Sequence, residues 1–466
     1  MAQQPITRRK FLTTGSALGA TALLGGKALR TAPRLLSRSS SPIQIQYWAA
    51  FVNSQSQNYF TKYYIDDWNN THPHIQVQLV IKDVNTLTQA TNTALDAGQG
   101  PDIVTSDGSS QVIPYAQAHQ ILPLTSYANK YGWHKLILPW AFGASTWKGQ
   151  LWSLPNPYET MVDYYNPETF SKHGWHAPAN RSELEELFKE AKGRGIQPII
   201  AGNADFKAAD EWFVTMFLNH YAGPDALYQA LSGKLRWTDP IFVDAIDLLN
   251  RYFQAGYIGN GSSVDNYFTT HFPQCYTAIA NGKAAMYWSG TWEIGSLPPY
   301  FGKAAGNTAT WTWSPIPALR SGIPPVLYEL SIGGATSINA HAKWPDAVAE
   351  YMSWSFANTR AAAVGLKEFG QELPPVHFTS ADFPAGTNPN DVRIYEELQK
   401  YSAEGLAGYT TWTFWPPRSD TYIINQFEYV LTKSITPKQY CAGLESAFRK
   451  EFEQGLVPPL FVPKSY

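Results

Sequence analysis

Cysteine, basic charge and long apolar runs are all scarce in this chain of 466 residues. Only two cysteines occur, Cys275 and Cys441, so a disulfide framework is excluded. Two isolated cysteines are usually unpaired core residues, and one bridge between them in an oxidising compartment is the alternative. The 35 Lys and Arg against 37 Asp and Glu give a formal net charge of −2, and no basic stripe occurs beyond residue 40. This charge balance argues against a nucleic-acid partner.

Several enzyme signatures are missing as well. The sequence has no Gly-x-Ser-x-Gly elbow, no His-Glu-x-x-His helix and no Gly-rich phosphate loop ending in Lys-Ser or Lys-Thr. His173 and His176 have the spacing of metal ligands on a helix, but Gly174 between them favours a loop or a surface pair. We therefore expect no metal and no cofactor. Internal repeats are absent too, which argues against an adhesive scaffold.

The first 38 residues are expected to be an export signal with a linker. The segment Thr7-Arg-Arg-Lys-Phe-Leu12 precedes a weakly apolar run over 13–26, which is too short for a membrane span of ~20 residues. An arginine pair before such a run resembles the twin-arginine translocation signal. The mature protein is then expected to be extracellular or periplasmic, on the outer side of the cytoplasmic membrane. A basic amphipathic anchor is the alternative.

Length and aromatic content both favour a ligand-binding protein of several domains. A chain this long exceeds one ordinary core, so two or more domains are expected. The sequence contains 17 Trp, 27 Tyr and 23 Phe, an aromatic share of 14%. Most of these rings fill the core, but Tyr and Trp also suit surfaces that hold flat polar ligands such as sugars.

The hydrophobic pattern predicts an α/β protein in which strands and helices alternate. Strands are predicted over 43–48, 75–81, 101–104, 161–165, 284–288, 326–332 and 335–338, with a hairpin over 147–152. Helices are predicted over 58–68, 86–97, 115–136 in pieces, 181–193 with Ser182 as N-cap, 210–221, 241–254, 266–281, 344–358, 420–431 and 437–455. The segment 409–418 is predicted to be a dense aromatic loop.

One strand end is a candidate binding position. The short apolar run over 284–288 predicts a buried strand, and Trp292 follows its carboxyl end. Ligands of open α/β sheets bind at that edge, where a Trp offers a flat apolar face and one N–H donor. The alternative is that Trp288 and Trp292 are core residues. Asp107 likewise follows the strand predicted over 101–104.

Several ordered motifs point to one family. They are Trp68-x-x-x-His72-Pro73, Gly100-Pro-Asp-Ile103, Trp147-Lys-Gly-Gln-Leu-Trp-Ser-Leu-Pro155, Asp163-Tyr-Tyr-Asn166, Gly282-Lys-Ala-Ala-Met286 with Gly290-Thr-Trp292, and Gly333-Gly334 followed by Asp346-Ala-Val-Ala-Glu-Tyr-Met352. In this order they resemble the extracellular solute-binding proteins of sugar ABC importers, the group that includes maltose-binding protein. Two features depart from that family: its usual lipid-modified Cys is missing, and a twin-arginine signal is less common there than a general secretory one.

The resemblance implies a two-lobed periplasmic-binding-protein-like fold, in which each lobe is a sheet flanked by helices. Residues 39–156 and 334–373 would form the first lobe, and 157–333 and 374–466 the second. The chain would cross the hinge between the lobes three times, near 155–159, 330–334 and 372–375.

The function that the resemblance implies is capture of a carbohydrate, and the many rings favour an oligosaccharide. A monomeric protein without catalytic activity would hold the sugar between its lobes and deliver it to ABC transporter permease subunits. Two rivals stay open. One is a secreted glycosidase, which needs two carboxylates about 5–9.5 Å apart, and the other is a binding protein for a non-sugar solute.

Site residues follow from the same resemblance. Trp292 matches the stacking Trp of the second lobe, and Trp412 or Trp415 matches the aromatic residue before the penultimate helix. Glu159 matches an acidic hinge residue, whereas the Trp that the family has near Asp107 is absent. The predicted ligand-binding set is Trp48, Asp107, Glu159, Asp210, Glu211, Trp212, Trp292, Gly334, Trp412 and Trp415.

Overall fold

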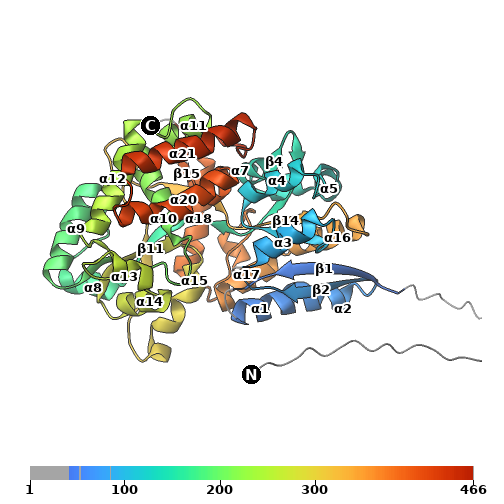
Figure 1. Ribbon diagram of the computed structural model, residues 1–466. Helices are drawn as coiled ribbons and strands as arrows, with labels where there is room; N and C mark the ends of the chain where they lie inside the picture. Colours follow the sequence, from blue (N-terminus) through green and yellow to red (C-terminus); the bar gives the residue numbers. More distant parts are fainter. Residues whose placement is uncertain (1–40, 52–53, 84–85, 465–466) are drawn as a thin grey trace, which may run out of the picture. The chain divides into compact units, whose positions relative to one another are not determined.

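The computed structural model describes residues 41–51, 54–83 and 86–464 (Figure 1). The predicted twin-arginine signal and linker, residues 1–38, lie outside this range and stay a prediction. The compact unit begins at Pro42. No helix within the described residues is long and apolar enough to cross a membrane.

The first sheet has five strands in the order β2-β1-β3-β14-β6. These are β1 (Ile43–Ala49), β2 (Ile75–Ile81), β3 (Ile103–Ser106), β6 (Leu154–Pro155) and β14 (Ala335–Ile338). Strand β1 runs parallel to β2 and β3, whereas β14 is antiparallel to β3 and β6. The parallel strands need helical crossovers, and they bring the carboxyl ends of β1 and β3 to one edge.

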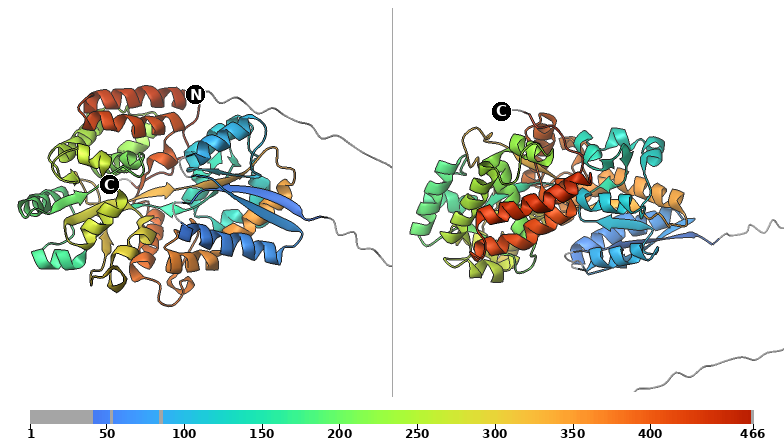
Figure 2. Two further views of the ribbon diagram at one scale, coloured as in Figure 1. Left: turned by 60° about the horizontal axis from the view of Figure 1, so that its bottom comes forward. Right: turned by 45° about the horizontal axis from the view of Figure 1, so that its top comes forward.

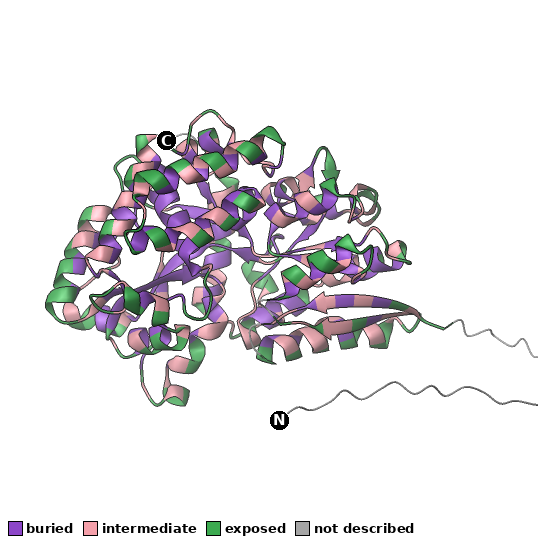
Figure 3. Ribbon diagram, in the orientation of Figure 1, coloured by how far each residue is buried: buried purple, intermediate pink, exposed green. Residues whose placement is uncertain are grey.

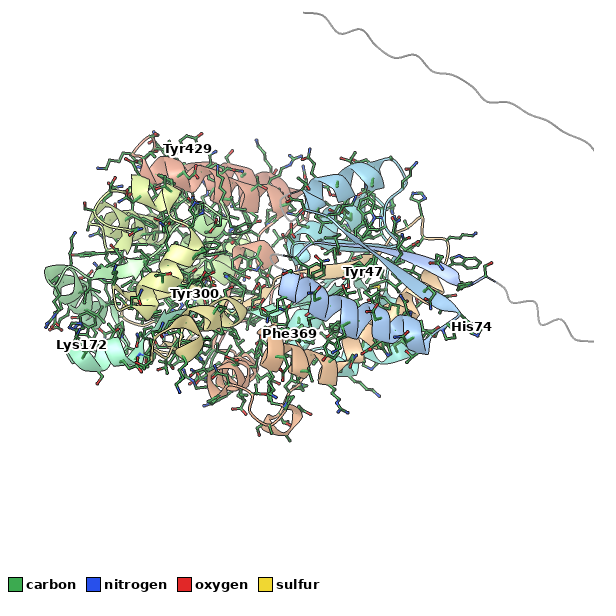
Figure 4. All side chains as sticks on the ribbon, turned by 90° about the horizontal axis from the view of Figure 1, so that it is seen from below. Tyr47, His74, Lys172, Tyr300, Phe369 and Tyr429 are labelled. Atoms are coloured by element: carbon green, nitrogen blue, oxygen red, sulfur yellow. The ribbon has the colours of Figure 1, made fainter. Side chains whose placement is uncertain are left out.

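Helices cover both faces of this sheet, with α1 on one face and α3 on the other (Figure 1; Figure 2). The helices of this part are α1 (Ser54–Phe60), the π-helix η1 (Thr61–Asp66), α2 (Asp67–Thr71), α3 (Leu87–Asp96), the 3-10 turn η2 (Ser109–Gln111), α4 (Val112–Gln117), α5 (Thr125–Tyr131), α6 (Trp133–Leu136), α7 (Pro139–Ala144), α16 (Pro345–Ala357) and α17 (Thr359–Phe369). Figure 4 shows Phe369 of α17 beside α1, and its ring lies 5.1 Å from that of Tyr59. The predicted hairpin is present as β4 (Thr146–Trp147) and β5 (Gln150–Leu151), where Lys148 and Gly149 both have positive φ.

The second sheet has the order β10-β9-β11-β8-β12. Its strands are β8 (Met161–Tyr165), β9 (Gln197–Ile200), β10 (Ile258–Gly259), β11 (Ala284–Gly290) and β12 (Thr312–Ser314). Strand β11 is buried along its whole length, as the apolar run predicts, and it runs parallel to β9 and antiparallel to β8. Figure 3 shows buried strands beneath partly exposed helices.

The helices around the second sheet come mostly from the middle and the end of the chain. They are α8 (Pro167–His173), α9 (Arg181–Gly193), α10 (Ala209–Phe217), the π-helix η3 (Leu218–Ala222), α11 (Pro224–Leu231), α12 (Pro240–Gln254), α13 (Asp265–Thr269), α14 (Phe272–Ala280), α15 (Glu293–Ser296), α18 (Pro389–Ala403), α19 (Thr411–Phe414), α20 (Pro417–Leu431) and α21 (Pro437–Glu453), with short 3-10 turns at 298–300, 303–305 and 380–382. Helices α20 and α21 lie side by side (Figure 2).

A third sheet has three strands, two of which directly adjoin strands of the first sheet along the chain. It has the order β15-β13-β7, with β7 (Tyr158–Glu159), β13 (Tyr328–Ile332) and β15 (Ala407–Tyr409). Strand β6 of the first sheet is followed directly by β7, and β13 is followed by β14 of the first sheet. These transitions fall where crossings are predicted, at 155–159 and 330–334. The lobe boundaries themselves stay a prediction.

Some local predictions are wrong. The N-cap of α9 is Asn180, not Ser182, because the Asn180 side chain accepts a hydrogen bond from the Glu183 N–H. The helix predicted over 266–281 is two helices, and Pro273 opens the second of them. The predicted aromatic loop over 409–418 begins at the last residue of β15, contains α19 and ends in the first turn of α20, and helices α17 and α18 were not predicted.

The two cysteines are both unpaired and buried, Cys275 in α14 and Cys441 in α21. The interpretation that they are core residues is confirmed. Burial accounts for the raised pKa of both thiols, which is about 12 for Cys441.

Trp68, the first residue of the motif Trp68-x-x-x-His72-Pro73, stabilises the local fold. Its ring is fully buried, stacks on His72 at 3.5 Å, and donates its indole N–H to the carbonyl of Ile75 at 3.0 Å. One side chain therefore joins the end of α2 to the start of β2.

We expect Trp68→Ala to lower the free energy of unfolding by about 3–5 kcal/mol, since a large buried ring and a hydrogen bond are lost. Chemical denaturation followed by circular dichroism measures the change. Trp344→Ala is the matched control, because Trp344 is 43% exposed, and its effect should stay within about 0.5 kcal/mol. Equal losses in the two variants would contradict this role for Trp68.

Candidate functional site

Five aromatic rings gather beyond the carboxyl end of β11. Trp292 directly follows this strand, and its ring lies 4.7 Å from that of Trp212 in α10 and 6.3 Å from that of Trp412 in α19. Phe206 and Phe272 lie 5.8 Å and 5.9 Å from Trp212. Phe206 is exposed and Trp292 is half-buried. We call Phe206, Trp212, Phe272, Trp292 and Trp412 the aromatic shelf.

Gly290 explains how the ring of Trp292 reaches this position. A Cβ atom at residue 290 would overlap the indole of Trp292, so only glycine lets the ring fold back over the strand end. The next residue, Thr291, donates a hydrogen bond from its hydroxyl to Glu372. The motif Gly290-Thr-Trp292 thus fixes both a ring and a carboxyl group.

A pair of carboxyl groups, buried Glu159 and half-buried Glu372, lies where the third sheet meets the shelf. Ser331 of β13 donates its hydroxyl to Glu159 of β7 at 2.9 Å and accepts the indole N–H of Trp412. A hydrogen bond joins Glu159 to Glu372. Burial raises the pKa of Glu159 to about 7, and burial together with repulsion from Glu159 holds the pKa of Glu372 well above its usual range.

A second group of carboxyls borders the shelf from another side. Glu211, which precedes Trp212, accepts the Thr411 hydroxyl at 2.7 Å and hydrogen-bonds to Asp420 of α20. Burial raises the pKa of Asp420 to about 7, and burial with repulsion from Asp420 raises that of Glu211 well above its usual range. Asp107 adds negative charge to both. We call Asp107, Glu211 and Asp420 the carboxyl cluster.

The loop after β3 brings Asp107 to this place. Gly108 packs so closely on α19 that a Cβ atom there would lie 2.5 Å from the carbonyl oxygen of Trp412 and 2.9 Å from that of Ile332. The following turn η2 also lies against α19. The end of the first sheet therefore contacts the segment that carries one ring of the shelf.

The structure brings together Asp107, Glu159, Glu211, Trp212, Trp292 and Trp412 from the predicted set. Trp48, Asp210 and Trp415 lie elsewhere, whereas Gly334 borders the site near Glu372. Trp48 donates its indole N–H to Gln46 and lies under the Lys82 ammonium, 4.1 Å from its ring. Trp415 is fully buried and packs on Trp237 at 5.2 Å.

Asp210 is also held in the interior. Its carboxylate accepts hydrogen bonds from Tyr267 at 2.7 Å and Asn203 at 3.1 Å, and burial raises its pKa to about 7. Gly334 lines a cavity of about 230 Å³ together with Tyr47 of the first sheet and Tyr351 of α16, and this cavity also reaches Glu372.

Sequence reasoning missed Phe206, Phe272, Glu372 and Asp420. Glu372 is the first residue of the third predicted crossing between the lobes, so the sequence offered a reason to include it in the site. Asp420 begins a predicted helix, where an acidic residue is ordinary because it complements the helix dipole. Within the described ranges, no group of three or more His, Cys, Asp or Glu is arranged to hold a metal ion.

The sequence model of bacterial extracellular solute-binding proteins matches residues 53–360, which is more than half of the chain. The chain belongs to this family. No curated protein matches the sequence significantly.

Solved structures of similar fold span nearly all of the described chain. A chitin oligosaccharide binding protein superposes with a TM-score of 0.74 at 18% identity, covering 88% of this chain and 99% of its own. A chain from a study of xylan utilization by the thermophilic bacterium Caldanaerobius polysaccharolyticus gives 0.72 at 22%, covering 87% and 99%. Maltose-bound MalE3 of T. maritima gives 0.69 at 16%, covering 88% and 99%. At such identities the likeness establishes the fold, and it confirms the predicted two-lobed periplasmic-binding-protein-like class.

The buried carboxyls predict how the stability of this solute-binding protein depends on pH. Glu159, Asp210 and Asp420 each have a pKa of about 7 when folded, against about 4 in an unfolded chain. Because their folded pKa is raised, their contribution to stability is present below about pH 4 and is lost as pH rises through about 7.

We therefore expect the free energy of unfolding to fall between pH 5 and pH 8, by up to about 1.4 kcal/mol per pH unit for each such carboxyl. Urea denaturation at several pH values measures the slope. In Asp420→Asn the slope should be smaller. A slope unchanged by this substitution would show that Asp420 does not have a raised pKa.

Proposed function

We propose that this protein captures a carbohydrate between its two lobes and delivers it to the permease subunits of an ABC importer. The aromatic shelf with carboxyls at its border is the observation that carries the proposal. Rings stack on the apolar faces of a sugar while carboxylates accept its hydroxyl groups. Two buried ring faces at about 1.5–3 kcal/mol each and two charged hydrogen bonds at about 1.5–3 kcal/mol each are enough for about micromolar affinity.

The named ligands of proteins with this fold support the same class. They include a chitin oligosaccharide, maltose and raffinose. Because the shelf extends over five rings, an oligosaccharide fits it better than a single sugar unit. The family supports a place outside the cytoplasm.

The proposed mechanism is closure about the third sheet. A ligand on the shelf would contact the loop of Asp107 and Gly108 only when the lobes are together, so it would shift the population toward the closed form. The closed form would then bind the permease subunits through both lobes.

The first test is a thermal-shift screen against mono- and oligosaccharides, polyols and amino acids. A true ligand at a hundred times its dissociation constant adds about 2.7 kcal/mol of stability. A stabilising sugar that stays chemically unchanged supports the carrier, whereas consumption of the sugar favours the glycosidase. If only a non-sugar solute stabilises the protein, the carbohydrate assignment is wrong.

With a ligand from this screen, we expect Trp292→Ala to weaken binding at least tenfold, because one stacking face of about 1.5–3 kcal/mol is lost. Isothermal titration calorimetry measures the affinity. Trp344→Ala is the control, because it removes an exposed ring that is not part of the shelf. This variant should bind the ligand with unchanged affinity. Normal affinity in Trp292→Ala would exclude Trp292 from the site.

Gly108 offers a test of closure. Gly108→Ala places a methyl group 2.5 Å from the Trp412 carbonyl oxygen, so we expect weaker binding and less compaction with ligand in small-angle scattering. Gly302→Ala is a close control. Gly302 has almost the same backbone angles, φ 80° against 87°, but no atom within 4 Å of its Cβ position. Equal effects of the two variants would point to backbone strain rather than to closure.

A further inference from the structure

The three groups of the carboxyl cluster come from separate elements and meet at α19. Glu211 of α10 is tied to this helix through the Thr411 hydroxyl, and Asp420 lies in the first turn of α20, directly after α19. Helices α10 and α20 pack on each other. Asp107 precedes Gly108, which packs on the Trp412 carbonyl. Three acidic side chains therefore converge beside the Trp412 ring of the shelf.

Within the part of the chain that the structure describes, no positive side chain pairs with these carboxyl groups. None of the ion pairs in the described parts of the chain involves Asp107, Glu211 or Asp420. Lys207, the basic residue next to Phe206 of the shelf, pairs with Glu428 at 3.4 Å. The exposed Arg418 uses its backbone N–H to bind Glu451, which adds a further negative charge at the start of α20.

The carboxyl group of Asp420 also has an oxygen atom that can still accept a hydrogen bond. Its side chain is only 6% exposed, yet its Oδ1 atom has no hydrogen-bond partner. A buried carboxylate oxygen without a partner is costly unless a donor reaches it. A cationic donor would make charge-assisted hydrogen bonds to the carboxyl groups and cation–π contacts with the neighbouring rings. Within the described residues, no group of three or more His, Cys, Asp or Glu is arranged to hold a metal ion. An organic cation therefore fits this cluster better than a metal ion does.

We infer that the shelf and the carboxyl cluster select a carbohydrate carrying a positive charge, such as an amino sugar, over neutral and acidic sugars. This inference rests on the proposed function, because it names the substrate class of the same site. The ammonium group would bind Asp420 and Glu211, with Asp107 closing from the first lobe, while the sugar rings stack on the shelf. An acidic sugar would place a like charge beside three carboxyls and would be excluded.

The test compares three oligosaccharides of equal length by calorimetry: glucosamine oligomers, their N-acetylated counterparts and galacturonate oligomers. We expect the glucosamine oligomer to bind about tenfold to a hundredfold more tightly than the acetylated one, as one charged hydrogen bond is worth about 1.5–3 kcal/mol. The galacturonate oligomer should not bind. Raising the salt concentration should weaken binding of the amine and leave the neutral oligomer almost unaffected.

Variants assign the preference to the cluster. Asp420→Asn keeps the shape of the side chain and should remove most of the preference for the amine over the neutral oligomer. Asp391→Asn is the matched control, since Asp391 is 5% exposed and has an unpartnered Oδ1 atom but lies on α18, outside the cluster. If Asp420→Asn does not fold, the salt dependence of the unaltered protein tests the inference instead. An affinity for the amine that added salt does not weaken would contradict it.

Two outcomes overturn the inference. If the neutral oligomer binds as tightly as the amine, or if the preference survives in Asp420→Asn, the charge selectivity is wrong while carbohydrate capture stands. If no carbohydrate binds at all, the proposed function fails and this inference fails with it.

Discussion

The Ser331 hydroxyl makes the pair of hydrogen bonds on which the site depends. It donates to Glu159 on the strand β7 and accepts from the indole of Trp412. Trp412 in turn contacts Trp292, and Trp292 contacts Trp212. One hydroxyl on the middle strand of the third sheet thus joins the point where the chain passes between the sheets to the rings that would hold a ligand. A change in the angle between the lobes would therefore move the rings of the shelf through the two hydrogen bonds of Ser331.

Burying so many carboxyls lowers stability near neutral pH, and the fold offsets that cost locally. Several of the buried carboxyls accept hydrogen bonds from neutral donors, as Glu293 does from the hydroxyls of Tyr287 at 2.6 Å and Ser289 at 2.9 Å. Such neutral donors satisfy oxygen atoms without filling the site with cationic side chains. A structure optimised for stability alone would replace these groups, so their retention is typical of a binding site.

The sequence predicted the main elements because their patterns are strong. The continuous apolar run of β11 and the following Trp292 lie where the pattern placed them, and Trp212 and Trp412 join Trp292. The choice between Trp412 and Trp415 could not be made from sequence, because both lie in one short aromatic segment. In the structure, α19 ends just before Trp415, and the ring of Trp415 packs on Trp237 in the core. Asp420 was missed for a related reason, since its partner Glu211 is distant along the chain and only the packing of α10 on α20 brings them together.

Three glycines determine how closely the parts of the site approach. A side chain would overlap the Trp292 ring at Gly290, the Glu159 carboxyl at Gly333 and the Trp412 carbonyl at Gly108. Backbone and functional groups are therefore in contact at each of these points, which leaves little freedom to reshape the site through its main chain. With the backbone held in this way, ligand choice in this protein would depend on the rings and the carboxyls. Because the rings suit the apolar faces of many sugars, the carboxyl cluster is the part of the site that can discriminate between ligands by charge.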